Sequence, residues 1–193
     1  MPNWCHNVLT VTGSAAEISA FVERARPTLE LKRKEYEETA AQSKTKPPLD
    51  QWFRENYGSQ PLTFQAFVPQ PPEVSDWYSW RCEHWGTKWD ASFDNPGIAL
   101  AAEDSTADLD ASLQANGLLR TPTVLVYRFE TAWTPPTEAV VAMAAQHPEL
   151  EFRLRYGQPG EGFAGEATFS DRKLQQDIEL EVEDVLAPEE MWF

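Results

Sequence analysis

Apolar and polar residues alternate along several short stretches of the chain. The alternation is regular over residues 150–156, where Leu150, Phe152, Leu154 and Tyr156 are separated by charged residues. Because side chains two positions apart lie on the same face of a β-strand, this stretch is predicted to be a half-buried strand. Alternation or β-branched composition predicts further strands at residues 7–12, 62–68, 89–93, 124–130, 163–169 and 178–182.

Two other stretches have apolar residues at helical spacing. From Ile18 they recur at i, i+3, i+4 and i+7, and Ser14 with Glu17 has the spacing of a capping box just before them. A second helix is predicted after residues 124–130, with Thr134 as its N-cap ahead of two prolines and its end before Pro148. Each predicted helix therefore follows a strand.

The predicted order is strand, helix, strand, an insertion, and then strand, helix, strand, strand. This order is that of an α+β, ferredoxin-like sandwich, in which a split β-α-β unit forms an antiparallel sheet with helices on one face. We expect residues 1–193 to form a single such domain, with a polar helical insertion at about residues 28–60 and a Trp-rich insertion at about residues 70–121. Weaker patterns indicate a strand at 98–102 and a helix at 106–116.

The Trp-rich insertion contains an unusual stretch, residues 77–90, with four of the eight tryptophans. If residues 74–85 are helical, Gly86 permits the left-handed turn that ends the helix. An indole removes on the order of 150–250 Å² from water when it packs, and its N–H needs a partner. The tryptophans therefore either line a pocket or fill part of a core.

Tryptophans also stand beside other predicted changes of chain direction, at Trp4 and Trp133. Strand ends and helix starts meet at shared edges of a ferredoxin-like sheet, so these segments can converge without long loops. The hypothesis that follows is a ligand-binding neighbourhood with Lys88 and Asp90 near its mouth, formed by Trp85, Lys88, Trp89, Asp90 and Trp133. A filled core is the alternative.

Charge narrows the classes of partner. The chain has 31 acidic and 16 basic residues, a formal charge of −15. Such a charge repels phosphate backbones and anionic lipid, so direct nucleic-acid binding and membrane binding are not expected, whereas a basic host or element-encoded protein is favoured. Residues 175–193 carry seven carboxylates and no Lys or Arg, which indicates an acidic interaction face or a solvated edge.

The sequence shows no clear pattern for a metal or cofactor site. Cys5, His6, Cys82 and His84 are the ligand types that zinc prefers, but adjacent residues of an extended segment face opposite ways, so no metal site is predicted. Nucleotide-binding and nucleophile-elbow fingerprints are absent, and no cofactor is expected. The start of the chain lacks the pattern of a signal peptide, and a cytoplasmic setting with free thiols is expected.

Three motifs carry a resemblance to a known family. They are Asn3-Trp4-Cys5-His6-Asn7, residues 85–90 (Trp-Gly-Thr-Lys-Trp-Asp) and residues 129–136 (Phe-Glu-Thr-Ala-Trp-Thr-Pro-Pro). Together they resemble the plasmid- and phage-borne YubB-like family, with the match running on to residues 162–165. The resemblance implies a ferredoxin-like domain and a mobile-element setting, and it implies no catalytic residues because that family has no established activity.

Two functions are compatible with the sequence. The first is a non-catalytic binding or interaction protein of a phage or plasmid that uses the Trp-rich pocket or the acidic face. The second is an enzyme of unrecognised, hydrolase-like type with its site around residues 85–90. Glu83, Asp90 and Glu161 are candidates for a carboxylate pair, but such a pair is defined by its separation in space.

Overall fold

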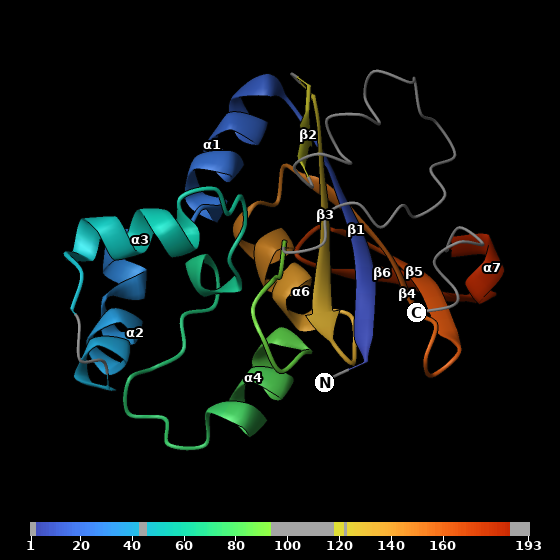
Figure 1. Ribbon diagram of the computed structural model, residues 1–193. Coiled ribbons are helices and arrows are strands. Elements are labelled where there is room, and N and C mark those ends of the chain that lie inside the picture. Colours follow the sequence, from blue (N-terminus) through green and yellow to red (C-terminus); the bar gives the residue numbers. More distant parts are fainter. Residues whose placement is uncertain (1–2, 43–45, 94–117, 122, 186–193) are drawn as a thin grey trace.

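A six-stranded antiparallel sheet forms the centre of the computed structural model, which describes residues 3–42, 46–93, 118–121 and 123–185 (Figure 1). The strand order is β2-β3-β1-β4-β5-β6. The elements are β1 (Trp4–Thr12), α1 (Ala15–Ala25), α2 (Leu29–Gln42), α3 (Leu49–Tyr57), the 3₁₀ helix η1 (Phe64–Ala66), α4 (Trp77–Trp85), β2 (Leu118–Arg120), β3 (Val124–Ala132), α6 (Thr137–Gln146), β4 (Glu151–Gln158), β5 (Phe163–Ser170), β6 (Lys173–Leu180) and α7 (Val182–Val185).

Strand β1 lies between the two strands that α6 connects. Leu9 pairs with Tyr127 on β3 and with Leu154 on β4, and β1 is antiparallel to both. Strands β3 and β4 are therefore parallel to each other, with β1 inserted between them and α6 crossing over, which is a split β-α-β unit. The predicted α+β, ferredoxin-like fold class is confirmed.

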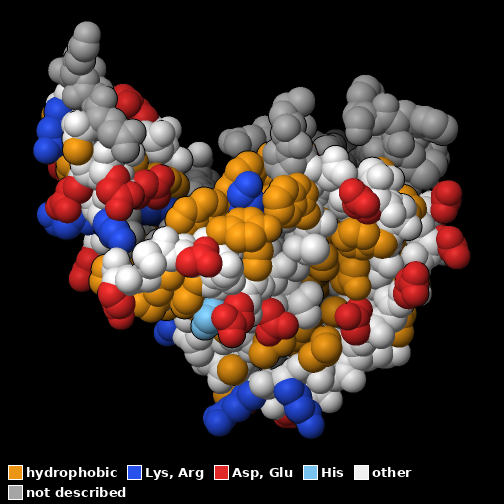
Figure 2. Space-filling view, turned by 90° about the horizontal axis from the view of Figure 1, so that it is seen from below, with side chains coloured by type: hydrophobic (Ala, Val, Ile, Leu, Met, Phe, Trp, Pro, Cys, Tyr) orange, Lys and Arg blue, Asp and Glu red, His pale blue; other side chains and the backbone are white. Residues whose placement is uncertain are grey.

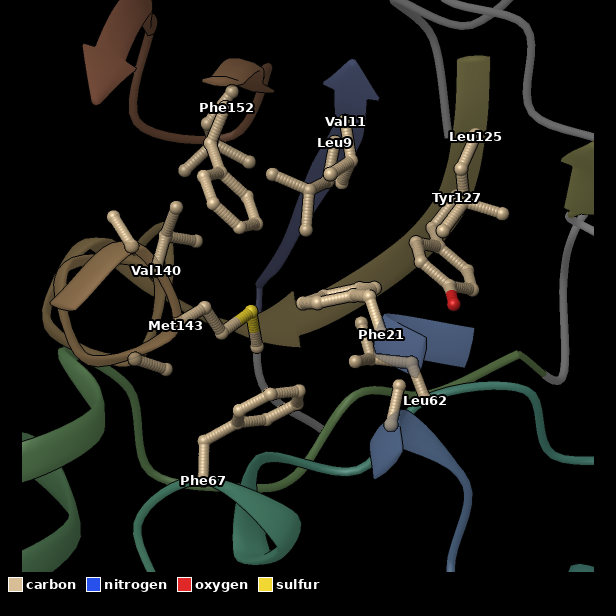
Figure 3. Packing of buried hydrophobic residues seen from close by; sticks show 14 of the residues in the cluster. Leu9, Val11, Phe21, Leu62, Phe67, Leu125, Tyr127, Val140, Met143 and Phe152 are labelled. Atoms are coloured by element: carbon tan, nitrogen blue, oxygen red, sulfur yellow. The ribbon is translucent and has the colours of Figure 1, made fainter. Parts of the chain in front are cut away.

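The hydrophobic core lies between one face of the sheet and the helices α1 and α6 (Figure 3). The predicted stripe of α1 is buried, and Ser14 and Glu17 form the predicted capping box. Phe21 is fully buried, and its ring lies 5.5 Å from that of Phe152 on β4, centre to centre. The apolar positions that alternate over residues 150–156 thus lie on the face that the helices cover.

The opposite face of the sheet is polar at its centre. His6 Nδ1 lies 3.3 Å from a carboxylate oxygen of Glu130, and Glu166 lies 2.6 Å from Arg153 and 3.5 Å from Arg155. The short helix α7 packs on this face through Val185, which is fully buried against Ala164. Helices therefore cover mainly one face, as expected, and one helical turn covers part of the other.

The polar insertion at residues 28–60 forms α2 and α3, which lie to one side of the sheet in Figure 1. Trp52 of α3 joins the two helices, because its ring lies 5.4 Å from that of Tyr36 on α2. The strand predicted at residues 62–68 is wrong. This stretch is mostly buried and contains η1, and its backbone groups are satisfied outside the sheet: the Thr63 N–H donates to the Ala25 carbonyl and the Phe64 N–H to the Asp90 carboxylate.

The Trp-rich insertion contains α4, which ends where the sequence predicts and begins three residues later than predicted. Asp76 caps its start by accepting a hydrogen bond from the Ser79 N–H, and Gly86 ends it at a φ of 80°. The strand predicted at residues 89–93 is reduced to a single bridge between Ser92 and Glu130. The elements predicted at 98–102 and 106–116 lie outside the described residues.

Candidate functional site

Trp85, the first of the predicted site residues, belongs to the core. It is fully buried, and its indole N–H donates to the Val68 carbonyl over 2.9 Å. Its ring lies 5.9 Å from that of Phe64, centre to centre. The helical phase of α4 turns this side chain towards the body of the protein and leaves no ring face open, so the structure places Trp85 apart from the other predicted site residues.

Lys88, Trp89 and Trp133 do come together, and they meet a residue that the sequence hypothesis left out. The Lys88 ammonium lies 4.6 Å from the ring centre of Trp89, 4.8 Å from that of Trp133 and 5.8 Å from that of Tyr78. These are cation–π distances. Two more rings extend the group, since Trp4 lies beside Trp89 and Trp77 beside Tyr78. We call this set of six residues the aromatic surface.

Three members of the aromatic surface are open to solvent. Trp77, Tyr78 and Trp133 have 41%, 40% and 40% of their surface exposed, respectively. Figure 2 shows a face on which hydrophobic side chains gather around one basic side chain, with acidic side chains about them. Contiguous exposed aromatic residues with a polar border are typical of an interaction site.

The backbone at Trp133 is held in an unfavourable conformation. Its φ is 74°, in the left-handed region that bulky residues avoid. The Trp133 N–H donates to the Asn3 carbonyl over 2.9 Å, and two hydroxyls fix the flanking chain: Thr87 donates to the Ala132 carbonyl over 2.9 Å, and Thr134 donates to the Gly86 carbonyl over 2.6 Å. Thr134 thus binds across to the end of α4 and is not the N-cap that the sequence predicted for α6.

Asp90 points away from the aromatic surface. Its carboxylate accepts hydrogen bonds from the Thr63 hydroxyl over 2.5 Å and from the Phe64 N–H over 2.7 Å. The Lys32 ammonium lies 3.7 Å from it, and Lys32 is 2% exposed. Asp90 therefore anchors α2 and η1 to the segment after α4, and the expectation that it shares the mouth of one site with Lys88 is not met.

A cleft of about 940 Å³ lies between the α2–α3 pair and α4. Trp77 and Trp89 line it on one side and Tyr57 lines it on the other. The Tyr57 hydroxyl donates to the Glu35 carboxylate, and burial, followed by this hydrogen bond, raises the pKa of Tyr57. Arg81 also reaches the cleft, with its guanidinium 4.8 Å from the ring centre of Trp85 and 5.2 Å from that of Trp77.

The candidate metal ligands do not form a group. Cys5 is buried on the helix-covered face of β1, whereas His6 faces the opposite side beside Glu130. His84 stacks on Trp80 along α4 with ring centres 4.3 Å apart. In the described part of the chain, no three His, Cys, Asp or Glu side chains are placed to hold a metal ion, and both cysteines are free thiols.

Sequence reasoning missed Tyr78, Lys32 and Arg81 for different reasons. Tyr78 follows Trp77 directly, so the aromatic composition of α4 was a signal that could have added Tyr78 to the site. Lys32 lies among Glu and Lys residues that read as a solvated helix, and no local pattern marks its burial. The role of Arg81 depends on two rings and a cleft that only the folded chain brings together.

The sheet topology and the exposed aromatic surface define an α+β protein with a ferredoxin-like fold and a candidate binding face. Residues 114–191 match the family model described as the ferredoxin-like domain in Api92-like protein. The crystal structure of protein api92 from Yersinia pseudotuberculosis is similar, with a TM-score of 0.55 and 12% identity over 93% of this chain and 98% of that chain. This likeness shows the fold alone.

The ferredoxin-like domain that the YubB-like resemblance implied is confirmed, whereas the YubB-like family and the mobile-element setting stay predictions. No curated protein sequence matches this chain. Among the described helices, none is long and apolar enough to cross a membrane.

Proposed function

We propose that this protein is a non-catalytic interaction protein whose aromatic surface binds a basic segment of a partner protein. The observation that carries the proposal is Trp133, which is 40% exposed and has a positive φ. A left-handed backbone costs a bulky residue about 1–3 kcal/mol. The strained backbone holds the ring at the surface with 40% of the residue still open, which is the arrangement that presentation of the ring to a partner requires.

The hydrogen bonds that hold the backbone around Trp133 also support an interaction function. Thr87 and Thr131 are fully buried, and their hydroxyls donate to the carbonyls of Ala132 and Thr134 on either side of the tryptophan. A rigid exposed aromatic residue loses little conformational entropy on binding, which is why tryptophan and tyrosine dominate binding energy at interfaces. The aromatic surface is preorganised in this sense.

Charge favours a basic partner over a neutral one. The net charge of −15 raises the rate of encounter with basic chains, and Glu83, Glu138 and Glu161 are exposed on the elements that carry or adjoin the aromatic surface. Ring faces also attract ammonium and guanidinium groups directly, as the contacts of Lys88 illustrate. We place this interaction in the cytoplasm and in a phage or plasmid setting, as the sequence resemblance suggests.

The enzymatic alternative gains no support from Asp90. Its two carboxylate oxygens accept hydrogen bonds from Thr63 and Phe64 and face Lys32, so Asp90 serves as an anchor. Trp85 is buried and cannot stack on a substrate. Asp90 and Trp85 are thus engaged within the protein, whereas the interaction function uses side chains that are open to solvent.

Peptide binding tests the proposal. A labelled peptide of lysine and leucine is titrated with the protein by fluorescence anisotropy, beside a matched peptide of glutamate and leucine. The basic peptide should bind more tightly, and Trp133→Ala or Tyr78→Ala should weaken it by about tenfold or more. Leu174→Ala is the matched control, since Leu174 is 39% exposed on β6. Equal binding of both peptides, or full binding by Trp133→Ala, would overturn the proposal.

A further inference from the structure

The cleft beside α4 contains a guanidinium that the protein leaves largely unused. In the described part of the chain, Arg81 makes one hydrogen bond, from Nε to Gln70 Oε1 over 2.8 Å, and no ion pair. Its Nη1 and Nη2 groups therefore keep their N–H donors. Burial lowers the pKa of Arg81, and the nearby carboxylates of Asp90 and Glu35 act in the opposite direction without forming an ion pair with it.

The geometry of Arg81 is fixed rather than flexible. Gln70 holds Nε, while the rings of Trp77 and Trp85 lie 5.2 Å and 4.8 Å from the guanidinium carbon. A guanidinium held in this way presents a planar fork that matches the two oxygens of a carboxylate or a phosphate. An anion that enters the cleft meets a donor pair that needs little reorganisation.

The two carboxylates that act on the charge of Arg81 already have other partners. Glu35 accepts from the Tyr57 hydroxyl and lies 3.7 Å from the Lys32 ammonium, and Asp90 lies 3.7 Å from the same ammonium. Lys34, at the edge of the cleft, donates to the Pro72 carbonyl over 3.2 Å. These two carboxylates attract the Arg81 guanidinium without pairing with it, so its Nη1 and Nη2 donors remain available to a ligand.

We propose that the cleft binds a small organic anion whose carboxylate or phosphate group is held by Arg81 and whose flat apolar part lies against Trp77 and Trp89. The cleft volume of about 940 Å³ is suited to a small molecule. This site goes beyond the proposed protein interaction. The cleft depends on Arg81, which is not part of the aromatic surface, although Trp77 and Trp89 belong to the aromatic surface and also line the cleft.

Titration with defined probes tests the site. Phenyl phosphate and benzoate separate the two head groups, inorganic phosphate lacks the ring, and phenol lacks the charge. Binding is followed by tryptophan fluorescence, because Trp77 and Trp89 line the cleft beside the proposed ligand. We expect phenyl phosphate or benzoate to bind more tightly than both inorganic phosphate and phenol. Arg81→Gln should weaken that binding by about tenfold, and Arg81→Lys should weaken it less.

Controls keep the outcome decisive. Arg33→Gln removes the same charge from an exposed position on α2 outside the cleft and should leave binding within about twofold of wild type. If Arg81→Gln does not fold, Gln70→Glu places a carboxylate beside Arg81 and should weaken binding by competition. Trp133→Ala should retain anion binding. No binding of either organic anion, or unchanged binding by Arg81→Gln and by Gln70→Glu, would overturn the proposal.

Discussion

The Lys32 ammonium lies 3.7 Å from the Asp90 carboxylate, with 3% of the Lys32 side chain and 17% of the Asp90 side chain exposed. Removing one partner of such a pair leaves an uncompensated charge in a site that water reaches poorly. Asp90→Ala is therefore expected to lower the free energy of unfolding by about 3–5 kcal/mol, measured by urea denaturation.

The same change at an exposed carboxylate is the control for Asp90. Asp50 lies exposed in the first turn of α3, and Asp50→Ala should change stability by less than about 1 kcal/mol. A double-mutant cycle with Lys32→Met should show that the two single costs are not additive. Additive costs would mean that the pair does not couple the insertion to the body.

Trp133 allows a test of backbone strain. Replacing it with glycine or alanine removes the same indole, but alanine keeps the Cβ that makes a φ of 74° unfavourable. Trp133→Gly should be more stable than Trp133→Ala by about 1–2 kcal/mol, as measured by urea denaturation. Equal stability of the two variants would show that the chain relaxes out of the left-handed conformation.

Alanine substitutions at the two glycines with positive φ distinguish the cost of backbone strain from the cost of steric crowding. Gly162→Ala meets no atom within 4 Å and should cost about 1–2 kcal/mol through its backbone alone. A Cβ at Gly86 would lie 3.1 Å from both the Pro135 carbonyl oxygen and the Thr137 nitrogen, so Gly86→Ala should cost about 1 kcal/mol more. Thermal melting of both variants measures the difference, and the reverse order would contradict the packing at Gly86.

The core face of β4 makes a separate prediction. Phe152 is 2% exposed and packs edge-on against Phe21. Phe152→Ala should cost about 3–5 kcal/mol, because a large cavity would remain between the sheet and α1. Leu174→Ala, at a position that is 39% exposed, should cost less than about 1 kcal/mol. An unchanged urea midpoint for Phe152→Ala would show that the side chain is not in the core.

The two cysteines should differ in reactivity. Cys5 is fully buried, and burial raises its pKa well above the usual range, so it is protonated at pH 8 and hidden from reagents. Cys82 is half-buried on α4 and should be alkylated by iodoacetamide first, as mass spectrometry would show. Because the folded-state pKa of Cys5 exceeds that of an unfolded thiol, about 8.5, its contribution to stability is complete below that pH and is lost as the pH rises above it. Equal labelling of both residues in the native protein would contradict this arrangement.

Local patterns predicted the parts of the fold that depend on neighbours in the sequence. The alternation at residues 150–156, the capping box of Ser14 and Glu17, and the turn at Gly86 all describe contacts within a few residues. The strand predicted at residues 62–68 was wrong, because whether an apolar run becomes a strand depends on a free sheet edge, which is a distant partner.

The sequence by itself determined the strand and helix at the start of the chain, the strand, helix, strand, strand order over residues 124–170, the acidic charge and the gathering of tryptophans near the ends of secondary-structure elements. Tertiary structure decided which of these side chains remain open. It buried Trp85, paired Asp90 with Lys32, and set Lys88 among the rings of Tyr78, Trp89 and Trp133. The physical reason is that burial and pairing depend on the positions of elements far apart in the chain, whereas periodicity records only which face of its own element a residue occupies.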